Sequence, residues 1–349
     1  MRIATFLVAL IAAFLTATGL GGAQTPPPID AYAANTAISS VDISPDGRRL
    51  AMLASVEGGE RRAIITNLDG SGATVMSLTD EVGVAPIGIN WLSDDYLMVD
   101  FVERRRAAGA GAQRNMQRRY IMRADGRRSN EIPPSAQIVR YVPEDPDHVI
   151  MALPVFRDDS SSIMASRGAA DAASLALGLF RYNLPRNSRS RLTVGAATTA
   201  SILMDDNYEP AVRYDIDSRA RRIEIFIENS GWQSVYREDY EEERYGRANR
   251  NRRIFTPAGT PAGLVGEGPA YYTSGYDSDR NLTYAYTFNP VTGAQTPLNF
   301  DTQGADFGGY LTDWRTGRVI GATWESLIPV RHYFDAEWRD LQSQLEATF

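Results

Sequence analysis

The 349-residue chain contains no cysteine, no lysine and only two histidines. The absence of cysteine excludes disulfides, thiolate metal sites, a cysteine nucleophile and a lipoprotein anchor. The two histidines, His148 and His332, are far apart in sequence, and we interpret both as turn or sheet-edge residues rather than as a general base or metal ligands. No metal site or other cofactor is therefore predicted, although a cation site built from oxygen ligands stays open.

A further absence concerns hydrolase chemistry. No Gly-x-Ser-x-Gly sequence occurs anywhere in the chain, so the strained elbow that raises a serine nucleophile is missing. We therefore assign no catalytic residue. The formal net charge of −7, with all 36 basic residues being arginine, argues against a nucleic-acid partner, because phosphate contacts require a basic surface.

The N-terminus has the pattern of an export signal over residues 1–23. Arg2 precedes an apolar run from Ile3 to Leu15, and small residues lead up to Gln24. The run is shorter than the ~20 residues of a spanning helix, so we expect cleavage before Gln24 and a periplasmic or secreted protein without a membrane anchor. An uncleaved anchor is the alternative. Residues 24–34 are predicted to be an extended linker, since three consecutive prolines forbid a helix.

Beyond the linker the chain shows a loosely repeated hairpin. In its first copy Val41 and Ile43 alternate with polar neighbours, which predicts a half-buried strand. Pro45, Asp46 and Gly47 then favour a tight turn before the apolar residues that begin at Leu50.

Acidic or glycine turns recur before later apolar strands. The acidic members step along the chain by 48, 51, 72 and 62 residues and lie at Asp46, Asp94, Asp145, Asp217 and Asp279, with a glycine turn at residues 315–317. Short second hairpins fall between them, which makes four strands per period, slightly longer than a propeller blade. The alternative is a large β-sandwich.

We therefore predict an all-β fold, a β-propeller of four-stranded blades over residues 35–349. About five or six blades are expected, forming an open arc that is prone to self-association through its unpaired edge. Two helices are predicted: a short one over Ala169–Leu177, and an amphipathic one over Ala336–Ala347 with Trp338, Leu341 and Leu345 on one face.

The ordered series of turns and tryptophans resembles a known family. The segments on which this resemblance rests are Ile43–Ala51, Ile89–Asp95, Val142–Asp147, Asn229–Trp232, Leu311–Arg318 and Tyr333–Asp335. The chain resembles the N-terminal β-propeller of secreted bacterial S9 (prolyl oligopeptidase) serine peptidases, in the dipeptidyl and acylaminoacyl peptidase-like branch. Members of that family continue into an α/β-hydrolase domain with a Ser-Asp-His triad, and this sequence shows no pattern of such a domain.

The resemblance implies a non-catalytic propeller that gates or positions peptide substrates for a hydrolase domain absent from this chain. Whether the chain is a fragment, a truncated product or half of a split enzyme stays open. The alternative function is a free-standing periplasmic propeller that binds a ligand or acts as a scaffold. The expected partners are peptides, a hydrolase domain or a second copy of the chain.

One acidic cluster is a candidate substrate-binding site. In dipeptidyl-peptidase relatives a glutamate pair on the propeller binds the free amino group of the peptide, and Glu241 and Glu242 match that pattern here. Two carboxylates can accept the hydrogen bonds of an ammonium group. The competing interpretation is a solvated loop of mixed charge, because Arg244 and Arg247 follow directly.

Overall fold

The computed structural model describes residues 38–55, 61–76, 84–106, 113–127, 129–156, 175–245, 251–255, 258–277, 281–298, 300, 304–313, 316–326 and 330–348. Within these residues nearly all regular structure is antiparallel sheet, followed by one helix near the C-terminus. The prediction of an all-β chain with an amphipathic helix at this end is confirmed.

The strands form successive small sheets, numbered here in chain order. Sheet 1 comprises β1 (Ile38–Ile43), β2 (Arg49–Ser55), β3 (Arg61–Asn67) and β4 (Thr74–Met76). Sheet 2 comprises β5 (Val84–Trp91), β6 (Tyr96–Arg106), β7 (Gln113–Arg123) and β8 (Ser129–Ile132). Sheet 3 comprises β9 (Gln137–Tyr141), β10 (His148–Phe156), β11 (Leu175–Asn183) and β12 (Ser188–Val194).

The second half continues the pattern. Sheet 4 comprises β13 (Thr199–Met204), β14 (Pro210–Asp217), β15 (Arg222–Glu228) and β16 (Trp232–Asp239). The hairpin of β17 (Glu241–Tyr245) and β18 (Asn251–Phe255) precedes sheet 5, which comprises β19 (Gly263–Leu264), β20 (Tyr271–Asp277), β21 (Leu282–Asn289) and β22 (Ala294–Pro297). Sheet 6 has three strands, β23 (Asp306–Thr312), β24 (Val319–Glu325) and β25 (Val330–Tyr333).

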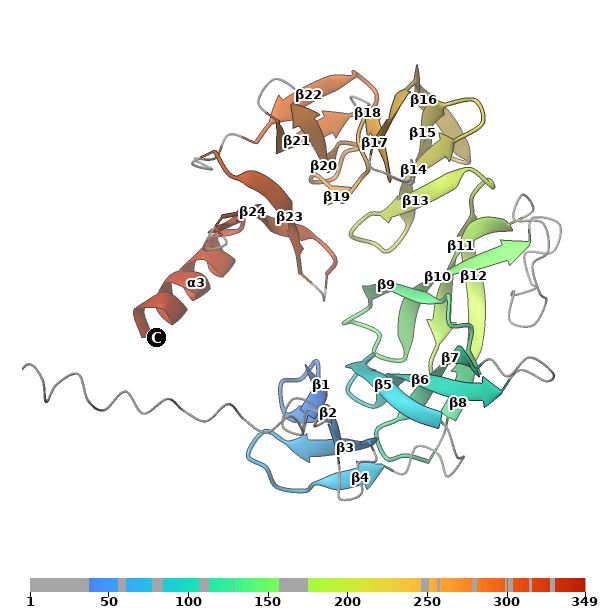
Figure 1. Cartoon of the computed structure of the whole chain (residues 1–349), viewed down its shortest axis with the longest axis vertical. Coiled ribbons are helices and arrows are strands. Elements are labelled where there is room, and N and C mark those ends of the chain that lie inside the picture. Colours follow the sequence, from blue (N-terminus) through green and yellow to red (C-terminus); the bar gives the residue numbers. More distant parts are fainter. Residues whose placement is uncertain are drawn as a thin grey trace, which may run out of the picture.

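The sheets follow one another around an arc, with sheet 1 at one end and sheet 6 at the other (Figure 1). In sheets 1 to 5 the first strand lines the inside of the arc and the last strand lies outside (Figure 1), which is the arrangement of propeller blades. In the described part of the chain no strand of sheet 1 pairs with a strand of sheet 6. The prediction of an open arc of about five or six blades is therefore confirmed.

The core lies between neighbouring sheets rather than in one central layer. Ala51, Leu53, Ile89 and Trp91 are almost completely buried where sheets 1 and 2 meet. Similar clusters join sheets 2 and 3, 3 and 4, and 4 and 5. Each sheet is too small to bury its own apolar surface, so the stability of each depends on its neighbours.

The side chains of β1 face the opposite way to the one that the sequence predicts. Val41 and Ile43 are 54% and 51% exposed, whereas Asp42 points toward sheet 2. The Trp91 backbone N–H donates to Asp42 Oδ2 over 2.7 Å, and the Trp91 indole N–H donates to the Asp42 carbonyl over 3.3 Å. The acidic side chain therefore turns inward because it satisfies a backbone donor of the adjacent strand.

Sheet 4 contains an ion pair that is largely removed from solvent. Arg213 Nε lies 3.1 Å from Asp215 Oδ1, and the two side chains are only 11% and 8% exposed. Thr199 Oγ1 donates to the same carboxylate over 2.7 Å. The Arg213 guanidinium also lies 3.8 Å from the ring centre of Phe226 and 5.2 Å from that of Trp232. This strand is thus held by charge and by stacking together.

The helix α3 (Ala336–Thr348) begins at a clear cap. Asp335 Oδ1 accepts the backbone N–H groups of Glu337 over 2.9 Å and Trp338 over 3.3 Å, as an N-terminal capping residue does. Trp338 stacks on Tyr333 of β25 with ring centres 6.0 Å apart. None of the helix residues is buried. Among the described residues no helix has the length and hydropathy that a membrane crossing requires.

Candidate functional site

The turns that join the first and second strands are the feature shared by all six sheets. They comprise residues 44–48, 92–95, 142–147, 205–209, 265–270 and 313–318. Side-chain contacts connect the turns of sheets 1 and 2, of sheets 3 and 4, and of sheets 4 and 6. These contacts bring the turns of sheets 1 and 2 together, and likewise the turns of sheets 3, 4 and 6.

A pocket of about 220 Å³ lies among the turns of sheets 1, 2 and 3, and we call it the turn pocket. Its lining consists of Pro45, Asp46, Leu92, Ser93, Asp94, Tyr141, Val142, Pro143, Pro146 and His148. Most of the lining is apolar, and the carboxyl groups of two aspartates are its acidic members. Apolar walls with a few polar groups are typical of small ligand sites.

The two aspartates are fixed by the turns that carry them. Asp46 Oδ1 accepts hydrogen bonds from Ser44 Oγ over 2.5 Å and from the Arg48 backbone N–H over 3.1 Å. Burial acts to raise the pKa of Asp46, but these hydrogen bonds and the charges of Arg49 and Arg48 outweigh it and lower that pKa. The Asp46 backbone N–H in turn donates to Asp94 Oδ1 over 2.9 Å. Asp46 is thus an ionised group held in one position.

His148 is held by two polar neighbours beside this pocket. Its Nδ1 lies 2.8 Å from Asp145 Oδ2, although the angle is not that of a hydrogen bond. Its Nε2 lies 2.9 Å from Asn183 Nδ2, while Asn183 Oδ1 accepts the Arg186 backbone N–H. With the amide oriented in this way, Nε2 is the acceptor. Both ring nitrogens thus join the β9–β10 turn to the β11–β12 turn.

His332 is a sheet-edge residue of β25. Its ring packs against Phe300 with centres 4.0 Å apart. Burial and the nearby charge of Arg339 lower the pKa of His332, so the neutral form is favoured. Within the described residues no group of three acidic or histidine side chains is placed to hold a metal ion.

A charged cluster adjoins the turn pocket and was not identified from the sequence. Arg318 of the sheet 6 turn makes a two-pronged ion pair with Asp206 of the sheet 4 turn, with Nε 3.0 Å from Oδ1. Burial lowers the pKa of Arg140 on β9, and the charge of Asp206 partly opposes this. The Arg140 side chain lies directly against Gly317. At position 317 there is no room for a side chain, and φ of Gly317 is +63°. Sheets 3, 4 and 6 therefore meet at this cluster.

The pair of Arg318 and Asp206 is exposed to solvent even though it connects the turns of two sheets that are not neighbours in the chain. The side chains of Arg318 and Asp206 are 60% and 54% exposed, so the pair contributes little to stability. On the far side of Asp206, Tyr208 donates its hydroxyl proton to Glu144 over 2.8 Å. Burial and this glutamate raise the pKa of Tyr208 to about 12. The turns of sheets 3, 4 and 6 are therefore connected by polar contacts.

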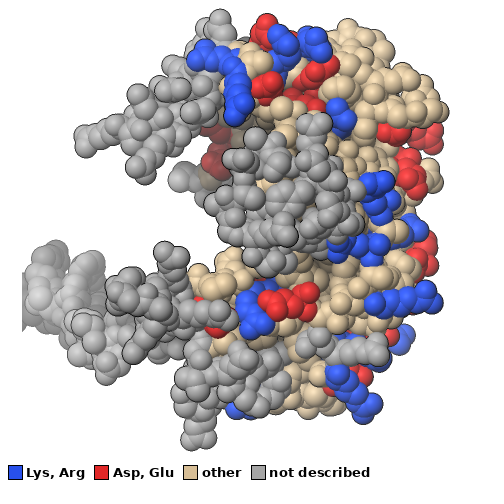
Figure 2. Space-filling view, turned by 90° about the vertical axis from the view of Figure 1, so that its right-hand side faces the viewer, with Lys and Arg blue, Asp and Glu red and all other residues tan. Residues whose placement is uncertain are grey.

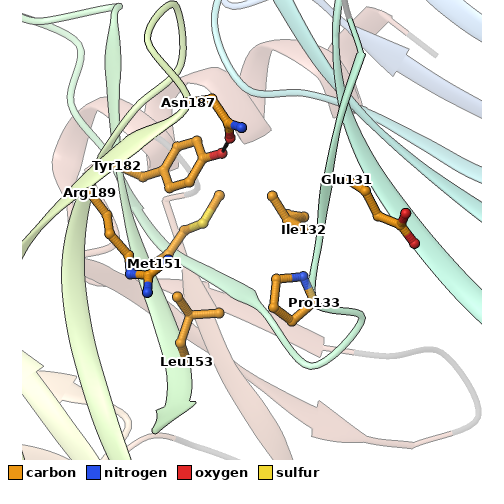
Figure 3. Close-up of a pocket in the computed structure, with 8 residues that line it drawn as sticks. All are labelled: Glu131, Ile132, Pro133, Met151, Leu153, Tyr182, Asn187 and Arg189. Atoms are coloured by element: carbon orange, nitrogen blue, oxygen red, sulfur yellow. Dashed lines mark hydrogen bonds between the residues drawn. The ribbon is translucent and has the colours of Figure 1, made fainter. Parts of the chain in front are cut away.

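A second pocket, of about 150 Å³, lies between sheets 2 and 3 (Figure 3). Its lining consists of Glu131, Ile132, Pro133, Met151, Leu153, Tyr182, Asn187 and Arg189. Tyr182 is hydrogen bonded to Asn187, and burial raises the pKa of Tyr182 to about 12. The Glu131 carboxylate turns away from the other lining residues in Figure 3 and accepts two hydrogen bonds from Arg118, each of 2.9 Å. We interpret this pocket as a gap between packed sheets.

The predicted substrate-binding glutamates, Glu241 and Glu242, lie in β17, paired with Phe255 and Ile254 of β18. Their side chains are outside the described set, so the assignment stays a prediction. On the outer face of the arc, arginine and acidic side chains are interspersed among other residues (Figure 2).

Comparison with known proteins yields structures but no sequence relatives. No protein-family model matches the chain, and no curated protein matches it. It is similar to Porphyromonas gingivalis dipeptidyl peptidase 4, with 8% identity and a TM-score of 0.47, over 87% of this chain and 44% of that one. It is also similar to Pyrococcus horikoshii acylaminoacyl peptidase, with 10% identity and a TM-score of 0.45, over 86% of this chain and 44% of that one.

A third similar structure is the β-propeller domain of the trilobed protease from Pyrococcus furiosus. It has 11% identity and a TM-score of 0.40, over 86% of this chain and 82% of that domain. The chain thus spans less than half the length of the two whole peptidases. The three structures are two whole peptidases and the propeller domain of a third protease. At these identities and TM-scores, the fold rests on the strand pairing described above.

Proposed function

We propose that the chain is the non-catalytic propeller of an exported S9-type serine peptidase and that it gates and positions peptides for a hydrolase domain. The observation that most supports this function is the turn pocket, which three consecutive sheets build from residues far apart in sequence. The ordered series of turns that resembles the S9 propellers contains most of its lining. The segments that resemble the S9 propellers are therefore largely the segments that form the turn pocket.

The chemistry of the turn pocket suits one or two residues of a peptide. Leu92, Tyr141 and the prolines give an apolar wall, and the ionised Asp46 gives an acceptor for a backbone N–H or an amino group. Backbone hydrogen bonds and one apolar side chain are what a short extended peptide offers. The exposed pair of Arg318 and Asp206 joins the turns of sheets 6 and 4, and we propose that it opens at little cost in stability to admit longer peptides.

The test is binding of fluorescein-labelled peptides of increasing length, measured by anisotropy with the full chain. We expect short peptides to bind and Pro146→Arg, which fills the exposed mouth of the pocket, to weaken binding at least about tenfold by steric exclusion. Asp147→Arg is the matched control: it adds the same side chain at the next exposed position, outside the pocket lining.

Equal effects of the two substitutions, or no binding of any peptide, would contradict the assignment of the turn pocket. Binding of one long partner protein with no peptide binding would instead support a free-standing scaffold. Loss of binding in a Glu241→Gln, Glu242→Gln double variant with Pro146→Arg unaffected would move the peptide site to β17.

A further inference from the structure

Sheet 1 presents an apolar row on the side that faces away from sheet 2. The row crosses all four strands, because Val41 is paired with Met52, Met52 with Ile64, and Ile64 with Val75. Val41 and Val75, at its two ends, are 54% and 53% exposed. Ile43, beside the row on β1, is 51% exposed. We call these residues the outer row.

The outer row differs from an ordinary solvent-facing sheet surface. On the opposite face of the same strands, Ala51, Leu53 and Ala63 are completely buried against sheet 2. Exposed faces of antiparallel sheets are normally polar. Sheet 1 is therefore apolar on both faces, as a propeller blade between two neighbours is, but the described residues cover only one of them. A contiguous apolar patch of this kind marks an interaction surface.

The helix at the other end of the arc carries a matching surface. Leu341 and Leu345 are 45% and 46% exposed on α3, and Trp338 completes their stripe at helical spacing. The helix is not loosely attached. Arg339 Nη1 donates to the carbonyls of Tyr333 and Phe334, each over 3.2 Å, in addition to the Asp335 cap and the stacking of Trp338 on Tyr333.

We propose that α3 of one chain packs its leucine stripe on the outer row of a second copy of the same chain. The two surfaces lie at the two ends of the arc and are apart in Figure 1, and the start of α3 is attached to the end of β25. A second copy can present its outer row to the helix without disturbing those contacts. Two chains related by a two-fold axis then make the contact twice and form a closed dimer.

Charge supports the pairing of these two surfaces. The helix carries three acidic residues, Glu337, Asp340 and Glu346, against one basic residue, Arg339. On sheet 1, Arg62 lies on the same face as Ile64, two residues before it on β3. An acidic helix beside a basic side chain at the edge of an apolar contact favours the register of that contact.

The absence of cysteine gives a direct test, because every thiol in a variant is then an engineered one. We would mix a Val75→Cys chain with a Leu341→Cys chain and add a short bifunctional maleimide at micromolar protein concentration. The proposal predicts a cross-linked species containing one chain of each kind, identified by mass. Light scattering of the unmodified chain should show a dimer that dissociates on dilution.

Leu341→Glu with Leu345→Glu should weaken the dimer at least about a hundredfold, because each leucine loses its burial and a charge enters the contact. Ser343→Glu is the matched control, since it adds the same charge on the opposite side of the helix, and it should change dimerisation less than about threefold.

Three outcomes would overturn the proposal. One is a chain that stays monomeric at all concentrations. Another is that a chain carrying both Val75→Cys and Leu341→Cys cross-links only within itself, which would show that α3 closes on its own sheet 1. The third is cross-linking of Val75→Cys chains to one another in place of the mixed pair, which would show that two outer rows pack together.

Discussion

Replacing Asp215 by alanine should be one of the most costly single changes in sheet 4. The substitution removes the carboxylate that lies 3.1 Å from Arg213 Nε and accepts a 2.7 Å hydrogen bond from Thr199. The arginine then stays largely buried, 11% exposed, without its counter-charge. Breaking a buried pair from one side costs about 3–5 kcal/mol, a large part of the roughly 5–15 kcal/mol that stabilises a typical domain.

The assay is urea unfolding followed by tryptophan fluorescence. Asp239→Ala is the matched control, because Arg222 Nε lies 3.0 Å from Asp239 Oδ1 in the same sheet but the two side chains are 40% and 73% exposed. That control should cost less than about 1 kcal/mol. Replacing both partners, Arg213→Met with Asp215→Leu, should cost less than Asp215→Ala alone, since no buried charge is left unpaired. Equal losses for Asp215→Ala and Asp239→Ala would refute the reasoning.

Three further predictions concern single contacts. Asp42→Ala should cost about 1–3 kcal/mol in urea unfolding because it leaves the Trp91 N–H without its acceptor, and Asp42→Asn should recover most of the loss; identical losses would contradict this. Arg318→Ala should change stability by less than about 1 kcal/mol but speed the binding of long peptides in stopped-flow anisotropy, and unchanged rates would argue against a gate. Burial raises the pKa of Glu238 despite its hydrogen bond from Tyr236, so the folded chain holds this proton more tightly and its contribution to stability falls as pH rises above about 4.5. Unfolding free energies measured across that range should fall less steeply for Glu238→Gln, and parallel curves would exclude the effect.

The fold could be predicted because the turn chemistry is local. Turns such as Pro45-Asp46-Gly47 specify where each hairpin reverses, independently of distant residues. The register of the repeat could not be read in the same way. In sheet 4 the series followed Asp217, the last residue of the second strand β14, and in sheet 5 it followed Asp279, which is outside the described residues. The turn of sheet 4 that corresponds to the turn of Asp46 contains Asp206, so the step of 72 residues, from Asp145 to Asp217, spans one strand more than a single repeat.

Prediction from the local sequence pattern also failed where contacts between distant residues determine the structure. The helix predicted over Ala169–Leu177 is wrong at its end, because β11 begins at Leu175 and pairs with Phe156 of β10; residues 169–174 lie outside the described residues. Similarly, the sequence gives no sign that Asp42 faces inward and Val41 outward, since that choice depends on the Trp91 N–H of another sheet. The meeting of Arg318 with Asp206, 112 residues away, is of the same kind.

The proposal of a peptidase propeller is tested most directly on the native protein. Antibodies against the chain would be used to precipitate it from its source cells, after labelling of those cells with a fluorophosphonate that reacts with active serine hydrolases. The account predicts a labelled serine hydrolase in the precipitate, either in the same polypeptide, with a mass well above 38.5 kDa, or in a tightly bound partner. An unlabelled species with no hydrolase partner would contradict it and leave the free-standing propeller.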